Sequence, residues 1–277
     1  MKKKSLSHNI LLYFALTILS LLFLLPFVWM IRSSLMDMNK IFVLPPIWIP
    51  KPFKFKNYLE AMTIVPFGRY FLNTLIILCL SLIGLLVTSV LAAFSFSRIK
   101  WRYRDLVFKL LLTSMMLPGA VTLIPTFIGW KTLGFYNTFV PLIVPAFLGG
   151  GAFNIFLLRQ FFMSIPIELD EAAYVDGANY FKILSNVILP LSRSAIIVVV
   201  VFAFMSYWND FFGPLIYLED SSKFTLAIGL QQFQGSYNNQ WHLLMAASTI
   251  VIIPEILVFL FGQKYFIEGI AITGLKG

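Results

Sequence analysis

Six long apolar stretches recur along this 277-residue chain and restrict its fold more than any other feature. A helix needs roughly 20 mainly apolar residues to cross a bilayer core about 30 Å thick. Inside lipid, every backbone N–H and C=O group must find a partner within its own segment, which favours helices. We therefore predict an all-α integral membrane protein with six transmembrane helices, at residues 10–31, 70–96, 106–128, 138–158, 191–212 and 243–262.

The composition excludes a soluble protein. Hydrophobic residues make up 59% of the chain and charged residues 12%, and the mean hydropathy is +0.86. That is more apolar surface than one soluble domain can bury. The net charge of +9 does not indicate nucleic-acid binding, because the basic residues are scattered at the ends of apolar stretches. We treat residues 1–277 as one transmembrane domain, and its single cysteine, Cys79, excludes an intrachain disulfide.

The distribution of lysine and arginine predicts the orientation in the membrane. In short loops these residues mark the cytoplasmic side. We expect both termini to be cytoplasmic, and the first stretch to be a retained span because it is longer than a signal-peptide core. The loop 32–69 is a lysine-bearing exception, with a short helix expected at 54–62. The residues that set the orientation are Lys2, Lys3 and Lys4 at the N-terminus, and Arg98, Lys100, Arg102 and Arg104 after the second stretch.

Several of the predicted spans contain helix breakers. They are Pro118 and Pro125 in the third span, Pro141, Pro145 and the run 149–151 of three glycines in the fourth, and Pro254 in the sixth. Membrane helices tolerate such residues where neighbouring helices satisfy the freed backbone groups. Small residues also allow helices to approach closely. The glycine run therefore has two readings, close packing and a hinge.

The loop 159–190 is the polar exception in this apolar chain. Acidic residues after Pro166 favour the first turn of a helix at 166–176, and Gly177 suits a left-handed cap at its end. Asn179 can cap a second helix that runs to Leu189, with Pro190 opening the next span. An apolar stripe on the second helix can pack on the bundle, so that the first helix projects toward a partner. The alternative is a simple cap over the mouth of the bundle.

The loop carries a motif with spaced residues. Glu171, Ala172 and Ala173 are followed by Asp176 and Gly177, and after a nine-residue gap by Val187, Ile188, Leu189 and Pro190. The pattern resembles the E-A-A-x-x-x-G-x9-I-x-L-P signature of permease subunits in binding-protein-dependent ABC importers, although Val187 stands at the consensus isoleucine. The resemblance implies the type I importer permease fold and a bacterial cell-membrane location.

The resemblance also implies partners and residue roles. It implies a cytoplasmic coupling helix that docks into one of two separate ATPase subunits, through Glu171, Ala172 and Ala173, with Gly177 making the turn. A second permease would complete the pore, and a solute-binding protein would act outside. A C-terminal tail at 263–277, with Gln263, Tyr265 and Gly277, would reach the ATPases.

Further stretches resemble one branch of these permeases, the smaller subunit of maltose and oligosaccharide importers. They lie at 71–74, 92–98, 208–211 and 263–266, and include Asn73 in the first. The resemblance therefore implies import of a carbohydrate, with the specific sugar set elsewhere in the complex.

Polar residues at membrane depth are candidates for the substrate path. Glu255 lies within the sixth span, where a carboxylate is costly unless it is paired or hydrated. We expect it to border the translocation cavity or to meet a polar neighbour. Tyr207, Asn209 and Asp210 combine an aromatic face with hydrogen-bonding groups, as sugar sites do. An interfacial aromatic belt is the equal alternative.

Motifs for other chemistry do not occur in the sequence. There is no G-x-x-x-x-G-K-[ST] loop, so we expect ATP and magnesium to bind partner ATPases and this chain to have no cofactor. Two histidines, His8 and His242, make a metal site or an intramembrane enzyme improbable. The alternative function is an ion-coupled secondary transporter, which only the broken helices and Glu255 support.

Overall fold

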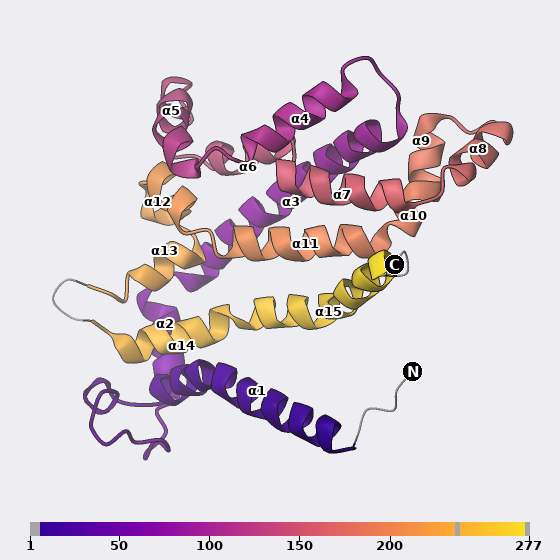
Figure 1. Cartoon of the computed structure of the whole chain (residues 1–277). Helices are drawn as coiled ribbons and strands as arrows, with labels where there is room; N and C mark the ends of the chain where they lie inside the picture. The colour runs from indigo at the N-terminus through magenta and orange to yellow at the C-terminus, as the bar shows by residue number, and fades with distance from the viewer. Residues whose placement is uncertain (1–5, 236–238, 275–277) are drawn as a thin grey trace. The chain divides into compact units, whose positions relative to one another are not determined.

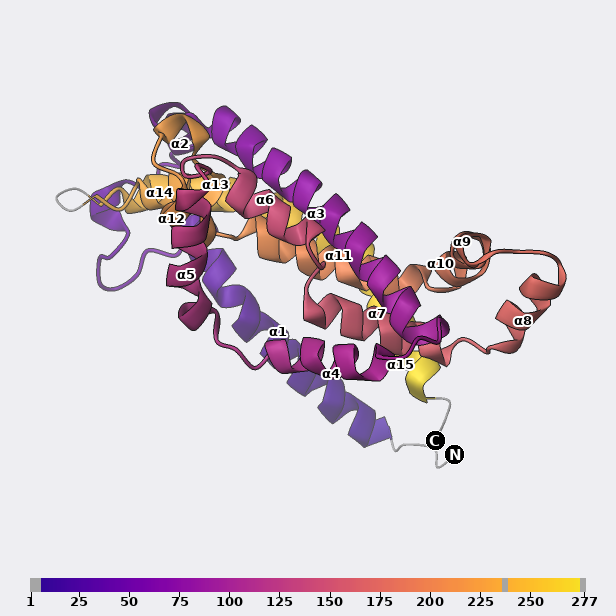
Figure 2. The same cartoon turned by 90° about the horizontal axis from the view of Figure 1, so that it is seen from above.

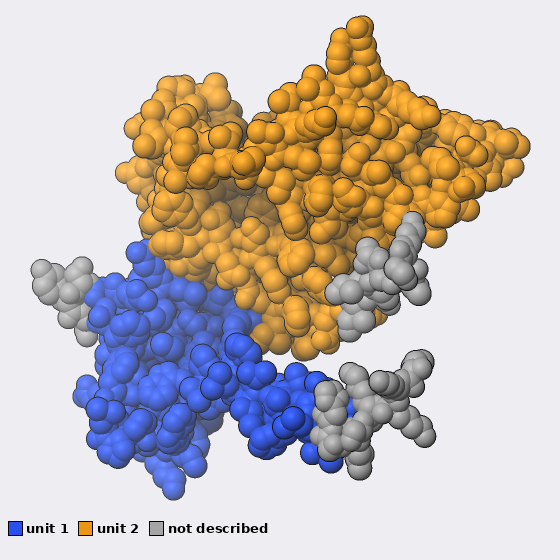
Figure 3. All heavy atoms as spheres, in the orientation of Figure 1, with its two compact units in different colours: residues 1–67, 229–253 blue, residues 68–228, 254–277 orange. Residues whose placement is uncertain are grey.

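The computed structural model describes residues 6–235 and 239–274. Over these ranges the chain is helical, with an isolated bridge between Gln234 and Asn239 and no strand. The predicted all-α class is confirmed. The chain forms two compact units, coloured separately in Figure 3: residues 1–67 with 229–253, and residues 68–228 with 254–277.

The first unit is built around the long helix α1 (Leu6–Ser34). It packs against α14 (Trp241–Val251), which also contacts α2 (Lys56–Ile64), as Figure 1 shows. The buried Arg32 organises the loop after α1, because its guanidinium donates to the carbonyl oxygens of Ile41 at 3.0 Å and Ile47 at 2.6 Å. α2 confirms the short helix expected at 54–62, shifted by two residues.

The second unit contains most of the remaining helices. In chain order they are α3 (Phe67–Arg98), α4 (Arg104–Ser114), α5 (Gly119–Thr132), α6 (Val140–Phe147), α7 (Ala152–Ser164), α8 (Glu168–Val175), α9 (Tyr180–Ile183), α10 (Leu189–Leu191), α11 (Arg193–Trp208), α12 (Phe212–Tyr217) and α15 (Ile253–Gly274). α13 (Leu226–Gln231) joins the two units in sequence, a π-helical turn (Leu184–Ile188) separates α9 from α10, and single 3₁₀ turns lie at Met38–Lys40 and Ser221–Lys223.

The core of the second unit lies where α3, α7, α9 and α11 meet. Its fully buried members include Ala93 of α3, Leu158 and Phe162 of α7, Ile183 of α9 and Val199 of α11. α15 packs closely against α11, because a Cβ atom added to Gly262 of α15 would lie 2.6 Å from the side chain of Val201 of α11. The loop that carries the motif is therefore anchored on the same core as the apolar helices.

Four helical stretches are long and apolar enough to cross a membrane, and two bent pairs raise the number to six. The four are Asn9–Ser34, Phe67–Arg98, Val140–Ser164 and Trp241–Phe266. α4 and α5 form the first pair, bent by 98° next to Pro118, and the stretch Tyr180–Leu191 forms the second with α11, bent by 78°. The predicted third span is therefore broken at a proline that the sequence marks as a breaker.

One prediction about the fifth span was wrong. We expected Pro190 to open this span, with a start at 191, but Leu189 and Pro190 belong to α10 and the next helix begins at Arg193. The π-helical turn before α10 explains the difference. Its wide backbone turn, closed by the Leu189 amide donating to the Leu184 carbonyl, lets Pro190 occupy the first turn of a new short helix, where its missing N–H costs nothing.

The glycine run at 149–151 joins α6 to α7 and packs closely on α3. Gly150 has φ +62°, and an added Cβ would lie 2.7 Å from backbone atoms of Leu85 and Ser89. One carbonyl at this break, that of Ala146, lies 3.0 Å from the Thr88 hydroxyl of α3, which can donate to it. These contacts bear out the packing reading of the run.

Candidate functional site

The first helix of the loop is α8. It begins at Glu168 and ends at Val175, and both ends lie within two residues of the bounds predicted at 166–176. Its first turn contains Glu168, Asp170 and Glu171, and no side chain caps it. The amides of Asp170 and Glu171 instead donate to the carbonyl of Ile167, at 2.9 and 3.1 Å. Carboxylates at this end complement the positive pole of the helix dipole.

Gly177 ends α8 in the left-handed conformation that the sequence predicts, with φ +78°. Its amide donates to the Tyr174 carbonyl at 2.9 Å, and the Ala178 amide donates to the Ala173 carbonyl at 2.9 Å. These two bonds define a Schellman cap. The predicted turn is confirmed, and Asp176 lies directly before it, exposed.

Asn179 caps the next helix, as predicted, by accepting a bond from the Lys182 amide at 2.9 Å. The apolar stripe of this helix packs inward, and Ile183, Leu184 and Ile188 are all buried. Tyr180 is the exception. It is half exposed, and its ring contacts the ring of Tyr174 at 5.5 Å between centroids.

The outer face of α8 is open to a partner. Leu169 is 42% exposed and Val175 is 88% exposed, and Glu171 and Ala172 between them are also exposed. Figure 2 shows α8 projecting at the edge of the second unit, beyond α9. A short helix that presents apolar side chains beside a carboxylate has the character of a segment that inserts into a groove on another protein.

The inner face of α8 is held by an ion pair that sequence reasoning missed. The Arg98 guanidinium, at the end of α3, lies 3.3 Å from the Asp170 carboxylate, and both side chains are 5% exposed. Burial raises the pKa of the Asp170 carboxyl, and the charge of Arg98 offsets part of this effect. The sequence suggested only an orientation role for Arg98 and a helix-dipole role for Asp170, because nothing local links the two residues.

Arg98 also binds α7. Its Nη2 atom donates to the carbonyl oxygens of Phe162 at 2.8 Å and Ile165 at 2.9 Å, where α7 ends. A cavity of about 270 Å³ lies beside the pair, lined also by Lys100, Glu171 and Tyr174. Desolvation of its hydroxyl and a hydrogen bond with Tyr180 raise the pKa of Tyr174 to about 12, so this phenol stays protonated.

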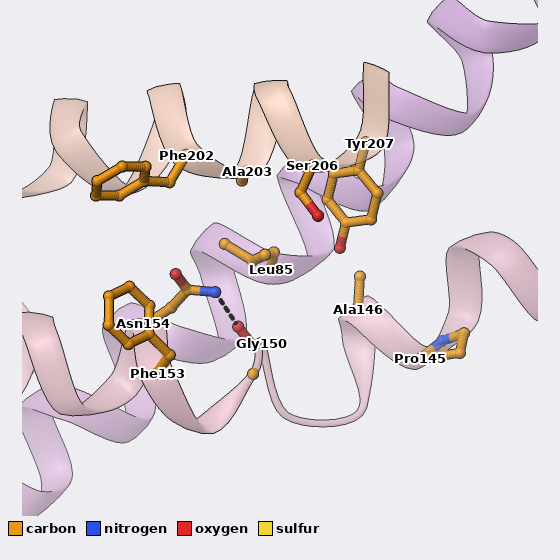
Figure 4. A pocket seen from close by; sticks show the side chains of 11 residues that line it. Leu85, Pro145, Ala146, Gly150, Phe153, Asn154, Phe202, Ala203, Ser206 and Tyr207 are labelled. Carbon is orange, nitrogen blue, oxygen red and sulfur yellow. Dashed lines mark hydrogen bonds between the residues drawn. The ribbon is translucent and has the colours of Figure 1, made fainter. Parts of the chain in front are cut away.

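A larger cavity of about 440 Å³ lies in the second unit at the break between α6 and α7. Figure 4 shows the Ser206 and Tyr207 hydroxyls pointing from α11 toward the break. Across the cavity, the Asn154 amide donates to the Gly150 carbonyl at 2.9 Å. The rings of Phe153 and Phe202 complete a lining that offers flat apolar faces and a few hydrogen-bonding groups.

The other residues proposed for a substrate path are spread over the second unit. Asn209 donates a hydrogen bond to Glu255, which is the polar neighbour expected for that carboxylate. Asp210 accepts a bond from the Gly213 amide at 3.0 Å. The buried Asn73 donates to the carbonyls of Ser222 and Phe224, at 3.0 and 2.9 Å. Among these residues Tyr207 lines the cavity, and a substrate role for any of them stays a prediction.

The residues proposed for a C-terminal contact lie on α15 or beyond the described residues. Gln263 is exposed and Tyr265 half-buried on a helix that continues to Gly274. Gly277 lies outside the described residues. An ATPase contact at this end therefore stays a prediction.

The sequence from residue 84 to residue 271 matches the family described as "Binding-protein-dependent transport system inner membrane component". The chain belongs to this family. The match includes α8, its Gly177 turn and the Asp170 side of the ion pair, together with Arg98. The protein is thus a multi-pass permease component of a binding-protein-dependent transporter, and the resemblance stated from the motif is confirmed.

Relatives of this permease match it over most of its length. The probable ABC transporter permease protein YurM of Bacillus subtilis is 33% identical, over 91% of this chain and 83% of that protein. The sulfoquinovosyl glycerol transport system permease protein SmoH of Agrobacterium fabrum is 28% identical, over 96% of this chain and 93% of that protein. A crystal structure of a bacterial ABC transporter involved in the import of the acidic polysaccharide alginate matches with a TM-score of 0.82 at 24% identity, over 96% of this chain and 100% of that chain. The last match shows that the fold is that of an ABC importer permease.

Proposed function

We propose that this permease forms half of the translocation pore for a carbohydrate and is driven by ATP hydrolysis in separate subunits. The observation that carries the proposal is α8, a short helix with an exposed outer face, a Gly177 cap at one end and a buried attachment to α3. A permease without a nucleotide-binding loop needs a contact through which another protein can move its helices. α8 offers that contact.

The cavity beside Tyr207 supports a sugar as the transported solute. Sugar rings stack their C–H faces on aromatic side chains, and their hydroxyls need directional hydrogen-bond partners. The aromatic faces in this cavity come from Phe153, Phe202 and Tyr207. The hydrogen-bonding groups include the hydroxyls of Ser206 and Tyr207. The names of two similar proteins also refer to sugar-containing solutes, sulfoquinovosyl glycerol for the relative from Agrobacterium fabrum and alginate for the importer of known structure.

The proposed assembly contains a second permease, two ATPases that bind ATP and magnesium, and a solute-binding protein. α8 would face the cytoplasm together with both termini, in a bacterial cell membrane. The lysine and arginine distribution supports this orientation. Residues 159–190 would form the coupling loop, and the end of the chain from Gln263 would make a second ATPase contact.

Co-expression with the ATPase and permease of the same transport system tests the proposal. We expect the ATPase to co-purify with the intact permease, and a solute-loaded binding protein to raise ATP hydrolysis in proteoliposomes. A matched variant with Ala172→Glu and Val175→Glu should keep the permease in the membrane but lose the ATPase, because two charges would meet the partner at the exposed face. Good expression without assembly, or retention of the ATPase by this variant, would contradict the proposal.

A further inference from the structure

We infer that Arg98 and Asp170 form a clasp that transmits the movement of α8 to α3 and α7, and that both are positioning residues for coupling. The inference rests on the proposed function, because it assumes that an ATPase moves α8. It adds the route by which that movement enters the membrane helices.

Apart from the ion pair, α8 has few attachments to the bundle. Asp170 is the only buried residue of α8, a helix that the structure describes in full. Other links are the Gly177 turn to α9 and the half-buried Ala173, which packs against the core of the unit. The ring of Tyr174 also contacts the ring of Tyr180, which in turn contacts Phe94 of α3 at 6.5 Å between centroids. The rings of Tyr174 and Tyr180 are 44% and 50% exposed, whereas both side chains of the ion pair are 5% exposed, so the ion pair links α8 directly to α3 at a buried position.

Arg98 joins three helices at once, namely α3, α7 and α8. One side of its guanidinium faces the Asp170 carboxylate at 3.3 Å, and Nη2 donates to two carbonyls at the end of α7. Those carbonyls belong to Phe162 and Ile165, which are buried in the core of the unit. A planar guanidinium can hold such a fork, whereas an ammonium group acts as a single point of charge.

The clasp between Arg98 and Asp170 resists separation. Charges buried at this depth interact more strongly than surface charges, and removal of one partner leaves the other desolvated. The negative pole at the end of α7 adds to the stability of the Arg98 charge. When α8 is displaced, the end of α3 and the end of α7 therefore follow it, while the exposed outer face of α8 stays free for the partner.

The test uses the whole transporter in proteoliposomes and measures solute uptake and ATP hydrolysis in one preparation. The readout is uptake per ATP hydrolysed. We expect Asp170→Asn and Arg98→Lys to lower this ratio by about fivefold or more, the low end of common coupling between sites. Asp170→Glu should restore the ratio, because it returns the carboxylate. Glu168→Gln is the matched control, because it removes an exposed carboxylate from the same turn of α8.

A double variant separates a clasp from two independent roles. If the residues act through each other, Arg98→Lys with Asp170→Asn loses no more than the worse single variant. The inference would be overturned if the assembled single variants had the wild-type ratio of uptake to ATP hydrolysed. It would also be overturned if the loss in the double variant equalled the product of the two single losses. Loss of the bound ATPase would also overturn it, because the pair would then serve docking alone. If the Asp170→Asn variant does not accumulate in the membrane, the ratio measured for the Arg98→Lys variant decides whether the inference holds. A wild-type complex that fails to assemble contradicts the proposed function instead.

Discussion

Replacing Gly177 by valine should strain the turn at the end of α8 without displacing any neighbour. Gly177 has φ +78°, and no atom lies within 4 Å of a Cβ added there. The cost is therefore conformational. An L-residue in the left-handed region costs about 1–2 kcal/mol, and a branched residue such as valine belongs at the upper end of the range of about 1–3 kcal/mol for strained positions.

The turn has a second option, which is to leave the left-handed conformation. It would then lose the bond from the Gly177 amide to Tyr174 and the bond from the Ala178 amide to Ala173, both 2.9 Å long. At about 0.5–1.5 kcal/mol for each hydrogen bond, this costs about as much as the strain. Either way, about 2 kcal/mol shifts the balance between the capped and the open turn about 30-fold.

The measurement is uptake per ATP hydrolysed in proteoliposomes, together with hydrogen exchange at residues 174–180. We expect the valine variant to reach the membrane, bind the ATPase and hydrolyse ATP with little uptake, and its turn amides to exchange faster. Gly177→Asn is the matched control, because asparagine tolerates the left-handed region. Gly177→Ala should lie between the two. Equal coupling in the valine variant and the wild type, or equal loss in the valine and asparagine variants, would refute this reasoning.

Three further outcomes follow from contacts in the structure. Gly150→Ala should lower the free energy of unfolding by about 2–5 kcal/mol, measured in a fluorescence melt, because of backbone strain and overpacking on α3. Gly129→Ala is the control, because its added Cβ meets no atom within 4 Å, and it should leave the free energy of unfolding unchanged or slightly raised. Asn179→Ala should cost about 1 kcal/mol, seen as faster hydrogen exchange at the Lys182 amide, and unchanged protection there would contradict the cap. The Glu255→Gln variant should keep ATP-driven uptake, and this uptake should persist when a protonophore collapses the proton gradient. Loss of uptake in either case would instead favour an ion-coupled secondary transporter.

Local chemistry explains why much of the loop could be predicted from the sequence. The helix at α8, the left-handed Gly177 and the Asn179 cap each depend on residues within one or two turns of the chain. The apolar stripe followed in the same way from helical spacing, and Ile183 and Ile188 are buried as expected.

Contacts between distant parts of the chain could not be predicted in this way. The pairing of Arg98 with Asp170 depends on how α3 and α8 meet, and the close fit of Gly150 on Leu85 depends on how the break in the fourth span lies against α3. The position of Pro190 inside α10 depends on a π-helical turn, which has no sequence signature of its own in the apolar stripe.

Because Asp170 is the only fully buried residue of α8, we expect this helix to be exchangeable between related subunits. With one buried side chain, the segment 168–176 could be grafted from another permease together with an acid at 170 and an arginine at 98. The stretches that line the cavity, around Asn154 and Tyr207, would remain untouched. If α8 docks the ATPase and the cavity binds the solute, as proposed, then the choice of ATPase and the choice of solute are encoded in separate parts of the chain, and one can diverge in evolution without altering the other.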